Sequence, residues 1–471
     1  MFDLFGNINK LRNIHSDSEK KKIAKLLQTT PEALEEFEKA YHLGVLEEPV
    51  SDNLFEVNAK QAAGMNDHIT VDDSEVESLI DRIVTELLSE TTFFKYEDGT
   101  VSYGDFGIPF PEHPVTKEEI LSLPESLRPQ LSGTLLKKEL NGDSYLGILS
   151  IYKEYLKEKN PQKKKMTYDI FRQGLEIQDL DPITYQIIAK NKNSIGHWFP
   201  ELTEAVKTQD FFKIPNTTII QVPLPLLQLT KLDYMGLTKT SLEIADRFCE
   251  KAFSLDRQKE YFIKTGVFSS KYDFRNAHIQ GAEEVRTIGE YLLFIHFQAS
   301  SMAHFDLNGR NQPVIYGPGT TVEWVCREFI QDKEQNPCIY KGLPLHTEYR
   351  VFIDADKNDV IGIAPYWDPD TMKKRFGHES DKDSPHQIHD YIIYMAHENI
   401  LMKRFAENKD SVVQHIKDML PDLNLTGQWS LDVMQNGNDF YIIDMALAIS
   451  LSSYLVPFLF DASLFTCCAV Q

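Results

Sequence analysis

The sequence is poor in cysteine and in basic residues. Its five cysteines show neither a paired framework nor the spacing of metal ligands, which fits a reducing compartment and argues against a disulfide scaffold or a zinc site. The formal net charge of -22 disfavours binding to nucleic acid or to an anionic membrane through charge alone, although it allows a local basic groove. We therefore expect neither a nucleic-acid partner nor a membrane partner.

Targeting signals are also lacking. The N-terminal stretch MFDLFGNINKLRN has no apolar core of the kind that a secretion signal needs. The most apolar stretch, residues 446–470, is interrupted by serines, Pro457 and Asp461, and no basic residue follows it. We expect a cytoplasmic protein whose final segment is buried, rather than one anchored by a membrane helix.

At 471 residues the chain is long enough for two or three domains. The first 210 residues read as mostly helical and their role cannot be assigned. Thr30 and Pro31 begin one predicted helix, and apolar residues at helical spacing predict an amphipathic helix over 76–88. The basic run at 160–166 is typical of a solvated loop, with anion binding as the alternative.

Residues 429–446 predict a β-hairpin with two carboxylates on one face. Its odd-numbered residues are apolar or aromatic, as a buried face requires: Trp429, Leu431, Val433, Tyr441, Ile443 and Met445. A two-residue Asn436-Gly437 turn would separate Asp432 from Asp444, whereas a three-residue loop over 437–439 pairs them directly. Because the hydrophobic face sets the register, we predict the three-residue loop.

Two carboxylates paired across a ladder repel each other unless a cation bridges them. Mg²⁺ carrying nucleotide phosphates is a common bridge of this kind. Without it, Asp432 and Asp444 should raise each other's proton affinity. The alternative is that both acids are simply solvated on an exposed face.

A second group of polar residues occurs in residues 259–271. Alternation in KEYFIKT places Phe262 and Lys264 on one face of a strand, and the loop GVFSSK follows. A lysine that ends a strand before a Gly/Ser loop is a plausible phosphate cradle, although neither GxxxxGK[ST] nor a dinucleotide fingerprint is present. The alternative is an edge-strand lysine beside a flexible loop.

Two further strands complete the pattern. Residues 321–330 form an apolar-rich strand, and residues 345–352 place Glu348 and Arg350 opposite the apolar face. Read alone, Glu348 and Arg350 would be a surface ion pair. His346 reads as a strand-end histidine, with substrate contact as the alternative. Helices are expected over 237–253, 281–303, 385–406 and 411–420.

In this order, the elements of residues 214–446 resemble the ATP-grasp superfamily. The resemblance implies an α+β fold in which two lobes clamp ATP between antiparallel sheets, preceded here by the mostly helical N-terminal region. The domains would be 1–210, a small lobe over 211–290 with the phosphate loop, and a large lobe over 291–471 with the Mg²⁺-binding hairpin.

The resemblance also implies a role for each matching residue on the small lobe. Lys264 would contact the α- and β-phosphates and take part in catalysis. Residues 266–271 would form a mobile loop over the phosphates, with Gly266, Ser269 and Lys271 binding nucleotide.

The linker over 327–330 would recognise adenine through its backbone, so the nucleotide-binding residues would include Arg327, Glu328, Phe329 and Ile330. Because recognition there would be through the backbone, a changed side chain at Arg327 should matter little, whereas proline at Phe329 would delete a donor N–H. Glu328 or Asp332 would reach the ribose.

On the large lobe, Glu348 would be another nucleotide-binding residue and Arg350 would stabilise the transferring phosphate. Asp432 and Asp444 would hold Mg²⁺. One departure weakens this part of the match: the family usually has D-x-N after the second acid, and here Ala446 replaces the asparagine. Alanine cannot ligate a metal.

The implied chemistry is ATP- and Mg²⁺-dependent ligation of an unidentified carboxylate, through an acyl phosphate, to an amine or similar nucleophile. It needs positioning and charge neutralisation rather than a covalent nucleophile on the protein. One alternative is an ATP-binding assembly or interaction protein that ligates nothing, which Ala446 favours. A second is a covalent nucleotidyltransferase at Lys264, whose usual K-x-D/N-G spacing is not met.

Overall fold

The computed structural model describes residues 73–131, 158–160, 163, 180, 185, 188–232, 234–306, 321–376 and 385–447. The helix predicted to begin at Thr30, most of the basic run over 160–166, and the apolar segment from 448 onward lie outside these residues. Among the described helices, none has both the length and the apolarity that crossing a lipid bilayer requires.

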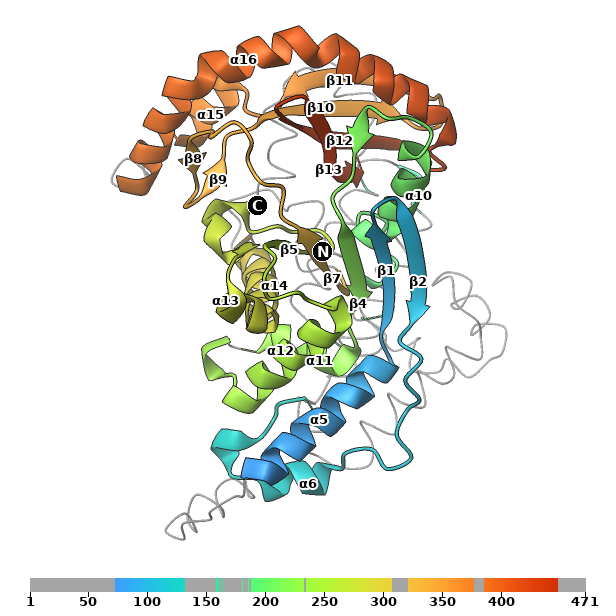
Figure 1. The fold of residues 1–471 in the computed structure, drawn as a ribbon, viewed down its shortest axis with the longest axis vertical. Helices are drawn as coiled ribbons and strands as arrows, with labels where there is room; N and C mark the ends of the chain where they lie inside the picture. Colours follow the sequence, from blue (N-terminus) through green and yellow to red (C-terminus); the bar gives the residue numbers. More distant parts are fainter. Residues whose placement is uncertain are drawn as a thin grey trace.

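The larger sheet, sheet A, has six strands paired antiparallel throughout (Figure 1). Its spatial order is β2 (Thr100–Asp105), β1 (Thr92–Glu97), β4 (Thr217–Gln221), β7 (Glu323–Glu328), β5 (Tyr261–Thr265) and β6 (His278–Ile279). The domain boundaries predicted at residues 210 and 290 stay a prediction. Sheet A contains strands from all three predicted domains, 1–210, 211–290 and 291–471.

Sheet B has five strands, antiparallel except for one parallel pair between β13 and β3. Its order is β11 (Asp359–Pro365), β10 (Thr347–Asp354), β12 (Gln428–Asn436), β13 (Asp439–Leu447) and β3 (Phe212–Lys213). A two-stranded sheet joins β8 (Cys338–Ile339) to β9 (Leu343–Pro344). The fold is therefore mixed α+β.

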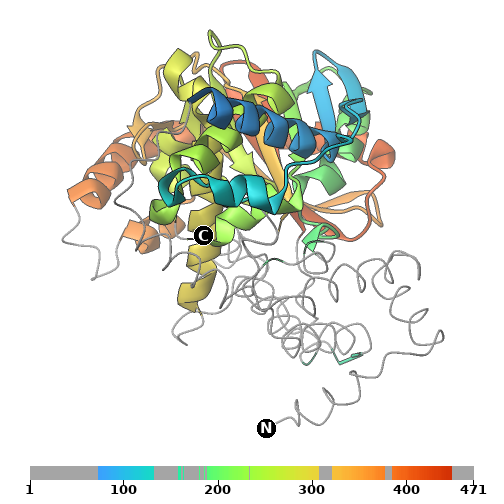
Figure 2. The same ribbon diagram turned by 90° about the horizontal axis from the view of Figure 1, so that it is seen from below.

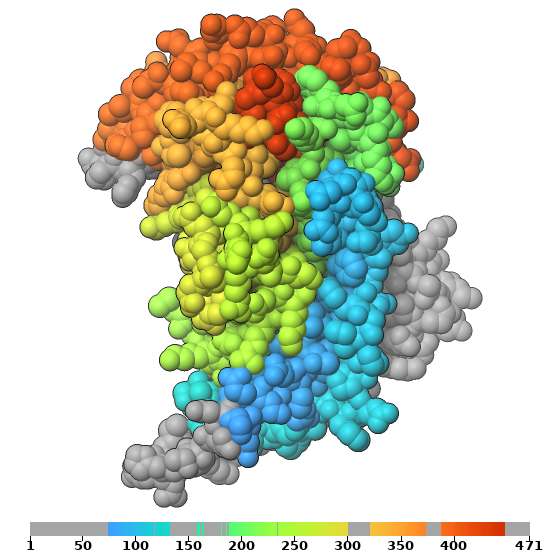
Figure 3. Space-filling model, viewed as in Figure 1, coloured from blue at the N-terminus to red at the C-terminus, as the bar shows by residue number. Residues whose placement is uncertain are grey.

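Helices cover the outer faces of both sheets (Figures 1 and 2). The α-helices are α5 (Asp73–Ser89), α6 (Lys117–Ser122), α10 (Ile195–Val206), α11 (Leu224–Gln228), α12 (Lys239–Phe253), α13 (Ala282–Arg286), α14 (Ile288–Asp306), α15 (Pro369–Phe376) and α16 (Pro385–Met419). The 3-10 turns are η1 (Glu125–Leu127), η2 (Leu229–Lys231), η3 (Tyr234–Gly236), η4 (Lys271–Asn276) and η6 (Leu420–Asp422). In Figure 3, the residues of α5 and α16 lie at opposite ends of the molecule.

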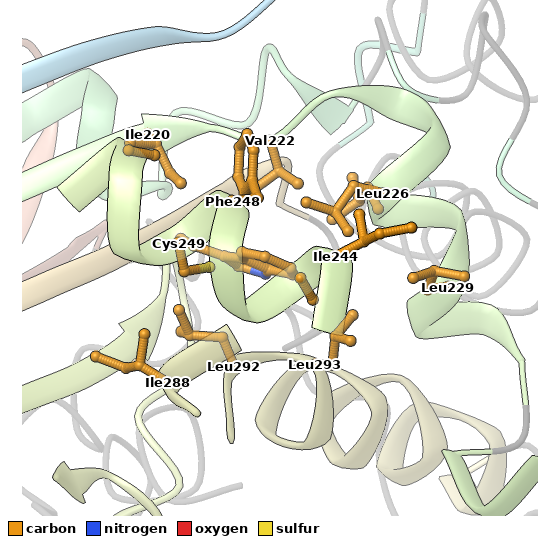
Figure 4. Close-up of a cluster of buried hydrophobic side chains, with 14 of the residues drawn as sticks. Ile220, Val222, Leu226, Leu229, Ile244, Phe248, Cys249, Ile288, Leu292 and Leu293 are labelled. Carbon is orange, nitrogen blue, oxygen red and sulfur yellow. The ribbon is translucent and has the colours of Figure 1, made fainter. Parts of the chain in front are cut away.

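One core fills the space between sheet A and helices α11, α12 and α14 (Figure 4). Alternation along β7 sends Trp324 and Cys326 into this core. Helices α12 and α14 approach closely at Gly289, where a Cβ would lie 2.2 Å from the carbonyl oxygen of Ala245. Glycine is therefore required there for the two backbones to meet.

A second core joins sheet B to α10, α16 and the other face of sheet A. Tyr349, Val351 and Ile353 enter it from β10, as alternation predicts, and Ile219 and Val325 reach it from sheet A. Sheet A thus separates two cores, and its face toward sheet B also carries Lys264 and Arg327 by the same alternation.

The N-terminal part contains one confirmed element and one that the sequence analysis missed. The helix predicted over 76–88 is α5, whose apolar face is buried in the first core. The region predicted to be mostly helical also supplies the β1–β2 hairpin, which extends sheet A. Its turn is Asp98-Gly99, both with positive φ, a recognised hairpin signal that could have found it.

The two helices predicted over 385–406 and 411–420 are wrong in one respect, because α16 runs without a break through Pro385–Met419. It packs along β10 and β11 on the outer face of sheet B, with Val412 and Ile416 in the second core. The interval between the predicted helices, residues 407–410, contains no proline or glycine and so nothing that would interrupt it.

Candidate functional site

A cleft lies between the facing surfaces of sheets A and B, with about 910 Å³ of empty space that includes the part open to solvent. One end is lined mostly by apolar residues, Phe262, Phe274, Ile330, Leu343, Met434 and Ile443, together with Arg327 as the cross-strand neighbour of Phe262 and Glu348 as that of Met434. The other end is charged, lined by Lys264, Lys271, Asp432 and Asp444. We call this space the main cleft.

The hairpin predicted over 429–446 is present as β12 and β13, and Asp432 does pair with Asp444. The predicted three-residue loop is wrong. The turn consists of Gly437 and Asn438 only, with Gly437 at φ +67°, and the register shifts by one residue beyond Asp432. A bulge at Ile443 makes up the difference.

The bulge also changes which residues of β13 are buried. Trp429, Leu431, Val433 and Met445 face the core as predicted, but the remaining core positions on β13 are Phe440 and Ile442, not Tyr441 and Ile443. Ile443 instead lines the main cleft. A bulge lets one strand change face partway along, which strict alternation cannot express.

Charged residues form a row across three adjacent strands of sheet B and onto sheet A. Arg350 on β10 is the cross-strand neighbour of Asp432 on β12, which is in turn the neighbour of Asp444 on β13. Lys264 then reaches Asp444 from β5 of sheet A, with Nζ 3.0 Å from both carboxylate oxygens. The two acids are thus flanked by two cations.

The expectation that Asp432 and Asp444 raise each other's proton affinity is wrong for Asp444. Burial by itself would raise the pKa of its carboxyl, but the charges of Lys264 and Arg327 hold that pKa below its ordinary value. For Lys264, burial is the larger effect and lowers the pKa of the ammonium, while Asp444 opposes the shift. Each acid has its own cation, so repulsion between the acids does not dominate.

Arg350 holds Asp432 rather than facing the cleft. Its Nε and Nη2 donate to the two carboxylate oxygens at 2.8 and 2.7 Å, and its guanidinium lies 4.5 Å from the ring centre of Tyr366. Arg350 is not among the residues lining the main cleft. In this geometry it positions Asp432, so contact with a transferring phosphate stays a prediction from the resemblance.

Asp432 and Asp444 are adjacent cleft-facing carboxylates that could ligate a metal, and Ala446 adds no donor. No cluster of three or more His, Cys, Asp or Glu side chains suited to a metal occurs in the described part of the chain. Mg²⁺ typically binds through one or two carboxylates together with waters and substrate phosphates. The donor set therefore fits Mg²⁺ that arrives with a phosphate ligand, rather than a resident structural cation.

Gly266 begins the predicted phosphate loop and is tightly packed. A Cβ at this position would lie 2.2 Å from Ser194 Oγ and 2.3 Å from Thr321 Oγ1. Its N–H donates to the carbonyl of Glu323, and its own carbonyl accepts the N–H of Ile195, the first residue of α10. Glycine is needed here because of crowding, and these bonds fix the start of the loop in place.

Farther along the loop, Ser269 and Lys271 line the main cleft. The Lys271 ammonium lies 4.0 Å from the ring centre of Tyr366, the same ring that Arg350 contacts. Phe268 is buried and its N–H donates to Thr265 Oγ1, so the loop is anchored by an apolar side chain. The loop therefore presents small polar groups and one ammonium group to the cleft.

Residues 327–330, the predicted adenine linker, line the main cleft. The Phe329 N–H, expected to contact adenine, instead donates to the carbonyl of Glu260 at 2.9 Å, because it continues the pairing of β7 with β5. Neither backbone group of Ile330 has a hydrogen bond to another described residue. Ile330 is thus the better candidate for backbone recognition.

The expectation that the Arg327 side chain is unimportant is also not supported. It is buried between the sheets, and its Nη1 donates to the carbonyl of Ile443. Nε and Nη2 have no partner in the described structure, and burial lowers the pKa of the guanidinium while Asp444 opposes that shift. Strand alternation, with Trp324 and Cys326 on the opposite face, was the signal that could have found it.

Glu328 and Asp332 differ in position. Glu328 lines the main cleft and accepts a hydrogen bond from Asn216 Nδ2 at 3.0 Å. Asp332 does not line it and instead accepts the N–H groups of Glu334 and Asn336 within its own loop. Of the two, Glu328 is therefore the one placed to reach a ribose.

Glu348 and His346 lie at the cleft wall and are buried. Arg350 is buried as well, so the surface ion pair expected of Glu348 and Arg350 when read alone is wrong. Burial and the nearby Asp432 raise the pKa of Glu348 to about 7, against the charges of Lys271 and Arg350. Burial also lowers the pKa of His346, so its imidazole is neutral at pH 7. The lining of the whole cleft has three basic side chains, Lys264, Lys271 and Arg327, and four carboxylates, Glu328, Glu348, Asp432 and Asp444. At the charged end Arg350 behind Asp432 adds a third cation to the two lysines, against two carboxylates, which favours an anionic ligand there.

A second, polar cavity, with about 670 Å³ of empty space that includes the part open to solvent, adjoins the charged end. It shares Lys264, Ser269, Lys271, Asp432 and Asp444 with the main cleft. Its other lining residues include Gly266, Ala446 and Asn193. Asn193 precedes α10, outside residues 214–446, and no pattern in the sequence singles it out.

No protein-family model and no curated protein matches this chain. The structure of Cdc123 from Schizosaccharomyces pombe aligns with 59% of this chain and 92% of its own, at 14% identity and a TM-score of 0.31. That of C-terminally truncated Cdc123 from the same organism aligns with 60% and 94%, at 15% identity and a TM-score of 0.32. TM-scores this low do not establish a shared fold, so function has to be inferred from the cleft.

Proposed function

We propose that the chain binds ATP with Mg²⁺ between sheets A and B, in the manner of an ATP-grasp clamp. The observation that carries this proposal is the polarity of one continuous cleft. An apolar slot with an unbonded backbone group at Ile330 suits a base, and the adjoining end with net positive charge suits phosphates.

In this arrangement adenine occupies the slot between Phe262 and Met434, and Glu328 receives the ribose. Lys264 and Lys271 contact phosphate oxygens, with the N–H groups of Ser269 and Ser270 as further donors. Asp432 and Asp444 hold Mg²⁺, which neutralises phosphate charge when bound. Arg350 keeps Asp432 in position.

We further propose that the bound nucleotide serves an assembly or interaction function rather than ligation. Arg350, the residue expected to stabilise a transferring phosphate, donates from Nε and Nη2 to Asp432 in a bidentate pair. Ala446 leaves the second acid without the usual amide neighbour. The arrangement at Arg350 and Ala446 favours binding of MgATP without transfer of its phosphate.

Ligation is the second candidate, and the polar cavity favours it. That cavity adjoins the phosphate end and is lined by Lys264, so a second substrate that entered it would lie beside the phosphates. A ligase would take a carboxylate and an amine there, with no covalent nucleophile from the protein.

Calorimetry with ATP, in the presence and absence of Mg²⁺, tests the proposal. We expect ATP to bind, and Mg²⁺ to tighten binding. No detectable binding of ATP in either condition would overturn it. Chromatography of nucleotides after incubation separates the two candidates, because a ligase releases ADP when both substrates are present, whereas the assembly function predicts intact ATP with every carboxylate and amine supplied.

A further inference from the structure

Asn193 lines the polar cavity together with Ala446 of β13, a position where β13 has no polar side chain. Asp444 and Ala446 share one face of β13, and both line this cavity together with Asn193. Ala446 offers no hydrogen-bonding side chain. The nearest position on β12, Ser430, is paired with Ala446, and its hydroxyl donates to the Ala446 carbonyl at 3.4 Å rather than lining the cavity.

The Asn193 side chain is held in a fixed orientation. Its Oδ1 accepts the N–H of Leu447 at 2.9 Å, its own N–H donates to Asn191 Oδ1 at 3.0 Å, and its carbonyl accepts Trp198 Nε1. Asn193 is only 7% exposed. Because Leu447 donates to the oxygen, the amide nitrogen is the end left to face the cavity.

Nδ2 has no hydrogen-bond partner within the described residues, although it belongs to a side chain that lines a polar cavity. An amide N–H₂ group is a donor and cannot ligate a cation, so it suits an anionic oxygen. The lysines that share this cavity, Lys264 and Lys271, suit the same ligand.

We propose that Asn193 donates a hydrogen bond to the terminal phosphate of bound ATP. This rests on the proposed function, and it assigns the phosphate end of the site a residue from the segment before α10. The amide that β13 lacks at Ala446 is thereby supplied from another element, but it acts on the phosphate and not on the metal.

The substitution Asn193→Asp tests the donor role. The carboxylate still accepts the Leu447 N–H, so the melting temperature of the nucleotide-free protein should change little. It now faces the phosphate with negative charge in place of a donor, so affinity for MgATP should fall at least about tenfold. Affinity for ADP should fall less, because ADP lacks the terminal phosphate. Unchanged or tighter binding of MgATP would overturn the proposal, since a third carboxylate would help a metal site.

Two further measurements keep the test decisive. The ratio of the ATP and ADP dissociation constants is obtained from the same folded protein, so partial unfolding of Asn193→Asp does not alter it, and an unchanged ratio would overturn the proposal. Ser430→Ala is the matched control, because it removes a side-chain hydrogen bond to the same stretch of β13 without touching the cavity, and wild-type affinities are expected. Failure of the wild type to bind ATP would instead reject the proposed function.

Discussion

Lys264 and Asp444 form an ion pair that joins the two sheets across the floor of the cleft, and they are unequally buried. The Lys264 side chain is 3% exposed and that of Asp444 is 41% exposed. A buried ammonium beside a half-exposed carboxylate leaves the carboxylate open to a ligand from the cleft. Asp444 can therefore bind a phosphate-bound cation from the cleft while the Lys264 side chain stays buried.

Replacing Lys264 with methionine removes the charge but keeps much of the volume. We expect nucleotide binding to weaken by about 1.5–3 kcal/mol, the size of a hydrogen bond to a charged group. Lys207→Met is the control, because Lys207 is exposed and pairs with Glu204 far from the cleft. Calorimetry that gives equal ATP affinities for Lys264→Met and the wild type would contradict the assigned role.

Asp432→Asn and Asp444→Asn should differ in stability before any nucleotide is added. Asp432→Asn leaves the buried Arg350 guanidinium without its counter-charge, and arginine cannot release its proton, so we expect a loss of about 3 kcal/mol. Asp444→Asn should cost less, because Lys264 can deprotonate. Urea denaturation measures both. Equal losses of unfolding free energy would contradict this difference between the two ion pairs. Both variants should also lose the rise in melting temperature that MgATP gives the wild type.

Arg327→Met should lower the affinity for ATP without lowering the unfolding free energy. The substitution removes a buried cation that lacks partners for two of its nitrogens, so the unfolding free energy should stay level or rise despite the lost bond to Ile443. ATP affinity should fall several-fold, by roughly 1 kcal/mol, because the positive potential at the phosphate end decreases. Melting curves and calorimetry on the same samples measure both effects. A variant that loses stability while keeping full affinity would show that Arg327 is only structural.

Proline substitutions test the adenine linker. Ile330→Pro removes an N–H that has no hydrogen-bond partner among the residues that the structure describes, so the fold should tolerate it and nucleotide affinity should fall. Phe329→Pro breaks the bond to Glu260 that pairs β7 with β5, so it should reduce stability first. Thermal melts with calorimetry tell these apart. Full ATP affinity in Ile330→Pro would place the base elsewhere.

Asp246 gives the fold a pH dependence separate from the site. Burial raises its pKa to about 8, and its Oδ1 accepts the N–H of Glu290 near the start of α14. Because the folded pKa exceeds the unfolded value, the folded state binds more protons, and this contribution to stability is lost as pH rises from about 4 to about 8. Asp246→Asn keeps the acceptor without the charge, so its advantage over the wild type should grow between pH 5 and pH 8. Melting temperatures that run parallel across that range would contradict this.

Local sequence determined which residues share a face. Alternation alone places Lys264 beside Phe262 and Arg350 opposite Tyr349, because side chains in a strand alternate with a period of two. It does not account for Asp432 and Asp444, because with the two-residue turn strict alternation would separate them, and the bulge brings them together. The same reasoning, applied with equal care to β7, would have turned Arg327 toward the cleft. It failed beyond Asp432 because a bulge at Ile443 interrupts the period.

Only the tertiary structure decided which charged side chains form ion pairs with each other. Lys264 and Asp444 are 180 residues apart, and no local pattern predicts that β5 of one sheet faces β13 of the other. Packing of the two cores sets that juxtaposition, and with it the burial that shifts the pKa of Lys264 and raises that of Glu348. Asn193 reaches the same cavity because α10 packs against sheet B, so its position depends on the assembled fold and not on its neighbours in sequence.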